Sequence, residues 1–275
     1  MEIVLCCLLW IPLHTTWVPV SDVLSASEPL DLGYLQMYNL EFAAAHQTFR
    51  EWASMHPEDP LVFSSDAAAN LFSEFDRLGV LQSDLFVDDR AFKRRKAPTP
   101  DPEIGEAFNR DLATSDRLAA AILERSPDDK RALYSEVLNL GMRGDYAALI
   151  QRRDLAGLGY MKKAGNRAAH LLAVDPECYD AYLAVGVENY LLGLNPAPVR
   201  WLLRLYGAET NKELGIEKLE LTAEKGHYLL PFARLMLAVA ALRDHDPGRA
   251  RELLGELARQ FPNNQLYQKE LARIH

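Results

Sequence analysis

The fold is decided by the stretch FAAAHQTFREWASMHPEDP, residues 42–60. Its apolar residues recur at spacings of three and four, which places one face of a helix at Phe42, Ala45, Phe49, Trp52 and Ala53. Pro57 cannot continue a helix and disfavours helical geometry at His56, so the helix ends there. Asp59 can cap the helix that follows. The stretch therefore predicts a helix, a tight turn and a second helix.

The same phrase of proline followed by acidic or amide residues recurs along the chain. It appears as Ser126-Pro127-Asp128-Asp129, Asp175-Pro176-Glu177 and Phe261-Pro262-Asn263-Asn264. From Leu30 onward the three-and-four spacing continues, without the sustained apolar-polar alternation that is typical of strands. We expect an all-α fold.

Proline at the end of a second helix, with small residues upstream, resembles the tetratricopeptide repeat, whose period is about 34 residues. Counting back from Pro57, the small residue of the first helix falls on Gly33, and the aromatic and alanine of the second helix fall on Phe42 and Ala45. The prolines are 70, 49 and 86 residues apart, at positions 57, 127, 176 and 262, so the repeats would be degenerate with insertions. The resemblance implies an irregular α-solenoid of tetratricopeptide-like antiparallel helix pairs.

A second resemblance covers residues 186–240. The runs YLLGLNPAP (190–198), WLLRLYG (201–207) and GIEKL (215–219) are similar to a segment of one repeat family. That family comprises the fungal inclusion-body-clearance protein of the mitochondrial outer membrane, its animal relatives and exported bacterial repeat proteins. The resemblance implies a proline-rich turn, a short amphipathic helix and a glycine-led helix, and it implies no particular reaction.

The first 27 residues form a separate apolar segment. Residues 3–11 are apolar, residues 1–49 contain no Lys or Arg, and the small residues Ser25-Ala26-Ser27 fit a cleavage site. We expect an export signal, and hence a periplasmic or envelope-associated protein. Because Glu2 stands where a signal carries positive charge, a buried N-terminal helix or an uncleaved membrane tether stays open.

We expect the rest of the chain to consist of three segments. Three prolines in five residues predict a semi-rigid linker over 97–102, in which Asp101 can cap the next helix. An N-terminal helical repeat would occupy 28–96, and the main repeat array would occupy 103–275.

The net charge and the absence of known motifs argue against several classes of function. A net charge of −9 gives no electrostatic reason to approach a phosphate backbone, so nucleic acid is excluded as a main partner. The seven histidines include no His-x-x-x-His pair, and the glycines at 141, 144, 157 and 159 lack a Gly-Lys-Ser/Thr sequence after them. Cys178 follows Pro176-Glu177 at an expected helix start, where a small residue is simply tolerated. The sequence predicts no catalytic, cofactor or metal site.

A binding role is the remaining prediction. Aromatic residues concentrate between 179 and 206, and we expect Tyr182, Tyr190 and Trp201 to line a groove that binds a protein or peptide partner, unless they belong to the core. The chain would then be a non-enzymatic scaffold or adaptor. The alternatives are a structural component of an envelope or organelle-membrane complex, tethered by residues 1–27, and an all-helical enzyme with an unrecognised site.

Overall fold

The computed structural model of the chain describes residues 29–81, 99–194 and 210–274. Over these residues every regular element is helical, which confirms the all-α prediction. The helices are α1 (Pro29–Tyr38), α2 (Phe42–Met55), α3 (Pro60–Leu78), α6 (Pro102–Leu123), α7 (Lys130–Asp145), α8 (Asp154–Val174), α9 (Tyr182–Gly193), α11 (Lys212–Lys225), α12 (Leu230–Arg243), α13 (Pro247–Gln260) and α14 (Gln265–Arg273). A single π-helical turn, η2 (Tyr146–Ile150), extends α7, and a 3-10 turn, η3 (Tyr179–Ala181), precedes α9.

Helix starts after the proline phrases are capped by the acidic and amide side chains that the sequence singled out. Asp59 accepts a hydrogen bond from the Leu61 amide, and Asp129 accepts one from the Ala132 amide. Asn264 caps α14 in the same way, and Asp101 caps α6. Each cap satisfies amide groups that the first helical turn leaves without an intrahelical acceptor.

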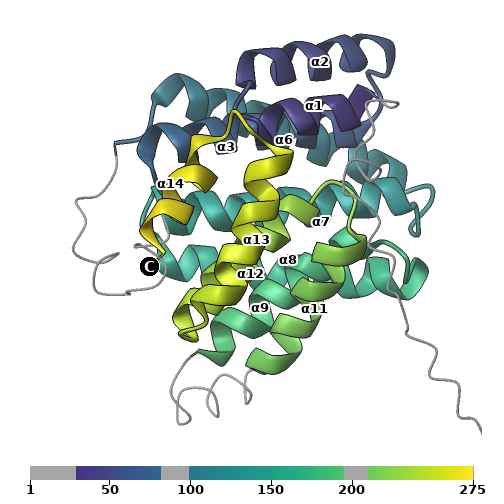
Figure 1. Cartoon of the computed structure of the whole chain (residues 1–275). Coiled ribbons are helices and arrows are strands. Elements are labelled where there is room, and N and C mark those ends of the chain that lie inside the picture. The colour runs from purple at the N-terminus through teal and green to yellow at the C-terminus, as the bar shows by residue number, and fades with distance from the viewer. Residues whose placement is uncertain (1–28, 82–98, 195–209, 275) are drawn as a thin grey trace, which may run out of the picture.

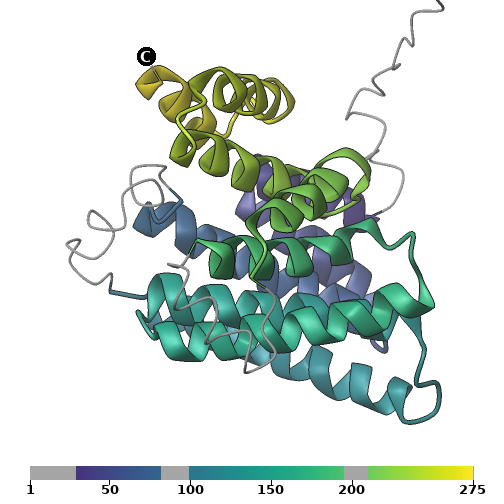
Figure 2. The same ribbon diagram turned by 90° about the horizontal axis from the view of Figure 1, so that it is seen from below.

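Helices adjacent in the chain pack side by side (Figures 1 and 2). Several pairs are antiparallel, as their contacts show. Between α3 and α6, a hydrogen bond joins the hydroxyls of Ser64 and Ser115, and Asn70 donates to Asp111. Between α9 and α11, glycine allows close approach, because a Cβ on Gly215 would lie 2.4 Å from the Tyr190 backbone nitrogen.

The predicted small residue Gly33 packs directly on the second helix of its pair. A Cβ at Gly33 would lie 2.2 Å from the ring of Phe49, which is fully buried. The aromatic ring thus occupies the space that a side chain on α1 would need. This contact sets the spacing of α1 and α2.

Aromatic side chains join the first helix to the last ones. The rings of Tyr34 and Tyr228 stack with centroids 4.4 Å apart, and the Tyr38 hydroxyl donates to the Tyr228 carbonyl at 2.9 Å. From the other end of the chain, Asn264 donates to the Tyr38 carbonyl at 2.8 Å. The row of helices therefore closes on itself, with α1 beside the turn that joins α13 to α14 (Figure 1).

Several predictions concern residues that the structure does not describe. Residues 1–27, on which the predicted export and the tethered alternative depend, lie outside the described residues, as do residues 97 and 98 of the linker 97–102 and the segment around Trp201. The helices on either side of the linker, α3 and α6, pack against each other. The boundaries at 28–96 and 103–275 stay predictions.

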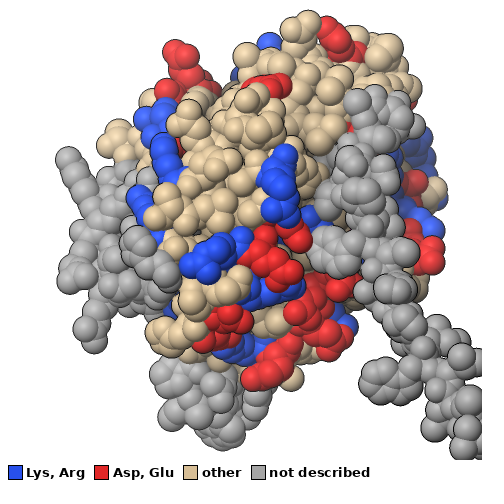
Figure 3. Space-filling view, viewed as in Figure 1, with Lys and Arg blue, Asp and Glu red and all other residues tan. Residues whose placement is uncertain are grey.

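The surface carries mixed charge on the face that Figure 3 shows, where acidic and basic side chains are interspersed. Of the helices that the structure describes, none combines the length and the apolar character needed to cross a membrane.

Candidate functional site

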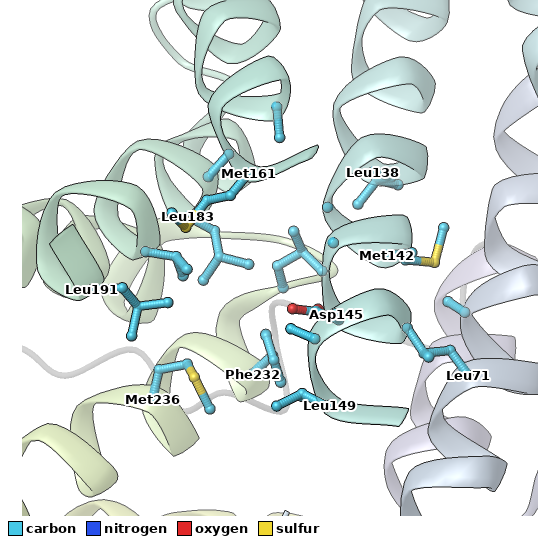
Figure 4. A pocket seen from close by; sticks show the side chains of 18 of the residues that line it. Leu71, Leu138, Met142, Asp145, Leu149, Met161, Leu183, Leu191, Phe232 and Met236 are labelled. Atoms are coloured by element: carbon cyan, nitrogen blue, oxygen red, sulfur yellow. The ribbon is translucent and has the colours of Figure 1, made fainter. Parts of the chain in front are cut away.

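A cavity of about 450 Å³ lies between the helices, within the range of small-ligand sites. Its wall is built from α1, α3, α7, η2, α8, α9, α11 and α12, and most of the lining side chains are apolar (Figure 4). The helices α7, α8 and α9 contribute about half of the lining residues. Apolar hollows of this size are typical of ligand-binding sites.

One face of α7 supplies the wall at its middle. Four of its residues line the cavity, namely Leu138, Gly141, Met142 and Asp145. They are three, one and three residues apart, so they lie on the same side of the helix. Gly141 widens the cavity, because a Cβ built there would meet no atom within 4 Å. A larger residue at this position would project into the hollow.

Methionine is concentrated around the cavity. Four of the six methionines of the chain line it, Met37, Met142, Met161 and Met236. The unbranched, polarizable thioether adapts to differently shaped apolar groups, and methionine-rich surfaces are typical of sites that accept varied apolar side chains.

Asp145 is the exception on this apolar wall. Its carboxylate points from α7 into the space framed by Leu183, Leu149 and Phe232 (Figure 4). None of the described residues forms a hydrogen bond or ion pair with this carboxylate. Asp145 is partly buried, and this desolvation raises the pKa of its carboxyl group to about 7 because it disfavours the charged form.

Asp180 also borders the cavity, but its carboxylate is fully engaged. It accepts hydrogen bonds from the Tyr134 hydroxyl at 2.9 Å and from the amides of His227, Tyr228 and Leu229 at 2.7, 2.8 and 3.2 Å. Burial raises the pKa of Asp180, and these hydrogen bonds act against that rise. The residue fixes the turn before α12 and is structural.

Exposed leucines extend the apolar surface beyond the cavity. Leu158 on α8 and Leu191 on α9 line the cavity and are 42% and 45% exposed, so they mark its opening. Leu155, three residues before Leu158 on the same helix, is 86% exposed. Apolar residues clustered at a cavity opening are typical of an interaction site.

The three residues predicted to bind a partner are not gathered in the described part of the structure. Tyr190 lines the cavity, is 6% exposed and packs its backbone on Gly215. Tyr182 lies at the other end of α9, where its hydroxyl donates to the Pro176 carbonyl and Lys218 lies over its ring. Trp201 lies outside the described residues.

Side chains considered for chemistry have ordinary surroundings. Burial raises the pKa of the Cys178 thiol to about 12, so the thiol keeps its proton at neutral pH. His170 pairs with Asp128 at 3.0 Å on the surface. Within residues 29–81, 99–194 and 210–274, no group of three or more His, Cys, Asp or Glu side chains could hold a metal ion.

The sequence analysis weighed Gly141 only as part of a phosphate loop and did not single out Asp145. Their signal is the stripe Leu138, Gly141, Met142 and Asp145, in which a carboxylate occupies a position that the helical period assigns to an apolar residue. The stripe can be recognised as part of a cavity only when it is known that this face of α7 points inward.

Comparison of the chain with models of protein families, with curated proteins and with solved structures finds no match.

Proposed function

We propose that this chain is a non-enzymatic binding protein, an irregular solenoid of tetratricopeptide-like helix pairs whose inner cavity receives apolar side chains of a protein or peptide partner. The function carries no chemical step. It rests on burial of apolar surface in a preformed hollow, which is favourable in proportion to the area removed from water.

The order of the helices supports the repeat assignment. Pairing α1 with α2, α3 with α6, α7 with α8 and α12 with α13 puts a proline phrase after each second helix. The first helix of each of these pairs lines the cavity, together with α8 and α9. First helices on the inner side are expected for a helical-repeat array. The contacts of α1 with α3 and of α3 with α7 fit the stacking of successive first helices.

The observation that carries the binding proposal is the cavity together with its apolar opening. A ligand confined to the hollow would leave Leu155, Leu158 and Leu191 in water. A polypeptide whose apolar side chains enter the hollow can also cover these leucines, as an amphipathic helix does in a hydrophobic groove. The methionines of the wall suit such side chains.

The test asks whether a larger side chain in the cavity wall blocks peptide binding. A phage-displayed library of random dodecapeptides is selected on the wild-type chain, and the enriched peptides are then measured against two variants by fluorescence polarisation. Gly141→Leu projects into the cavity. Gly255→Leu makes the same change on α13, away from the cavity lining, where a Cβ would meet only the end of the Arg259 side chain at 3.5 Å.

We expect peptides rich in apolar residues at three-and-four spacing, with affinity for the wild type and Gly255→Leu. Their affinity for Gly141→Leu should be at least tenfold lower, because one blocked apolar side chain is worth about 1.5–3 kcal/mol. Equal binding to both variants, or a selection without enrichment of apolar peptides, would overturn the proposal. Circular dichroism checks that both variants keep their helical content.

A further inference from the structure

The apolar cavity presents one carboxylate that the described residues leave without a partner, that of Asp145. A charge removed from water is costly unless it is paired or hydrogen-bonded. Asp180 borders the same cavity, and its carboxylate accepts hydrogen bonds from four donors. Asp145 has none from the described residues, although it faces the hollow (Figure 4).

The other charged side chains on the wall do not compensate Asp145. They are Asp154 at the start of α8, Asp180 before α9 and Arg243 in the last turn of α12. Asp154 is exposed at the opening. The raised pKa of Asp145 has desolvation as its cause, without a contribution from Arg243. The remaining lining residues of α1, α3, α9 and α11 are uncharged.

The backbone next to Asp145 also departs from regular α-helix. The π-helical turn η2 begins directly after Asp145 and inserts an extra residue into the helix, so that both Ala148 and Leu149 reach the cavity wall. Single π turns are energetically poorer than α-helix and occur frequently at functional sites. A wide turn and an unpaired carboxylate thus coincide at one point of an apolar wall.

We propose that the partner segment that enters this cavity carries a lysine or arginine among its apolar residues, and that its cationic group pairs with the carboxylate of Asp145. This inference rests on the proposed function. The apolar side chains fill the hollow, and the cation supplies the partner that the described residues do not give to the Asp145 carboxylate. Specificity follows, because a segment with a neutral or acidic residue at that position leaves Asp145 without a partner or opposes it with a like charge.

This pairing makes binding depend on pH. In the unliganded chain the pKa of Asp145 is about 7, so near neutrality a large fraction of the carboxyl groups carries a proton. A lysine on the partner stays charged to about pH 10, and it pairs with the ionised form. Affinity therefore rises as pH increases through 7 and levels off above it.

The experiment uses the peptides selected on the wild-type chain. We expect a lysine or arginine at a fixed position among the apolar residues. Replacing that residue by norleucine should weaken binding to the wild type at pH 8 by at least tenfold, because buried charge pairs at interfaces couple by about 1.5 kcal/mol or more. On Asp145→Asn the same replacement should change affinity by less than about twofold, and the affinity of the cationic peptide should no longer rise between pH 6 and pH 8.

The outcomes separate this inference from the proposed function. Apolar peptides that bind the wild type but not Gly141→Leu, without a fixed basic residue, would overturn the pairing and leave the binding function standing. A basic residue whose effect persists in Asp145→Asn would also overturn the pairing, because the cation would then contact another group. Binding that is insensitive to Gly141→Leu would overturn both.

Discussion

Asp145 and Asp180 are carboxylates on the same cavity with opposite energetic roles. Asp180 receives four hydrogen bonds, whereas the described residues give Asp145 none. A buried charge stabilises a fold only where its partners repay the desolvation. Substituting each by its neutral isostere, asparagine, should therefore change stability in opposite directions.

Asp145→Asn should stabilise the unliganded chain at neutral and alkaline pH. The folded-state pKa of about 7 lies above the ordinary value of 3.8, so the folded state holds its proton more tightly than the unfolded state. Stability from this group is fully present below pH 4, falls as pH rises from about 4 to 7 and then stays constant. The gain from asparagine should thus grow from near zero at pH 4 to about 2–4 kcal/mol at pH 8. Urea denaturation at both pH values measures it, and a gain independent of pH would contradict the burial of this carboxylate.

Asp180→Asn should destabilise the chain. The amide group of asparagine turns a donor toward the backbone amides of His227, Tyr228 and Leu229, which need an acceptor. Leaving buried amide donors unsatisfied costs about 1–3 kcal/mol for each group. The midpoint of urea unfolding at pH 7 should fall, in contrast to that of Asp145→Asn. An unchanged midpoint would show that water can replace the carboxylate at this turn.

At the scale of elements, the sequence predicted the helices and their ends because those depend on neighbouring residues. Pro57 and Pro127 stop helices, and Asp59 and Asp129 cap the next ones within two or three residues of the chain. The turn after Pro176 differs. There Asp180 caps the amides before α12, almost fifty residues away, and a 3-10 turn precedes α9. A cap that acts across the fold has no local sequence signal.

The pair α9 and α11 depends on a glycine contact. A Cβ at Gly215 would lie 2.4 Å from the Tyr190 nitrogen, and the backbone of α9 cannot move aside like a flexible side chain. Gly215→Ala should therefore push the two helices apart and lower the free energy of unfolding by about 1–3 kcal/mol. Gly159→Ala, where a Cβ meets nothing, should instead add stability by up to about 1 kcal/mol through helix propensity. Thermal unfolding of both variants tests the contact, and equal melting temperatures would contradict it.

At the scale of the whole molecule, the cavity was beyond sequence reasoning. Periodicity shows that Leu138 and Met142 share a face of α7, but it does not show whether that face meets another helix or an open space. The same limit applies to Tyr190, which the sequence placed either in a groove or in the core. In the structure it lines the cavity with 6% of its surface exposed. Which helices face inward depends on how the whole row curves, and that follows from many contacts between distant residues.

The closure of the row has a measurable consequence, because Asn264 serves both the last helix and the first. Its side-chain oxygen caps α14 through the Leu266 amide, and its side-chain nitrogen donates to the Tyr38 carbonyl at the end of α1. Asn264→Asp keeps the capping oxygen and loses the donor, whereas Asn264→Ala loses both.

In a closed row, loss of that donor leaves the buried Tyr38 carbonyl unsatisfied and costs about 1–3 kcal/mol. Hydrogen–deuterium exchange followed by mass spectrometry should therefore show faster exchange in α1, residues 29–38, for Asn264→Asp as well as Asn264→Ala, with faster exchange in α14 mainly for Asn264→Ala. If the two ends were energetically independent, both variants would leave exchange in α1 unchanged. A response in α1 to a substitution more than two hundred residues away links the ends of the array, and with them the walls of the cavity, into one cooperative unit.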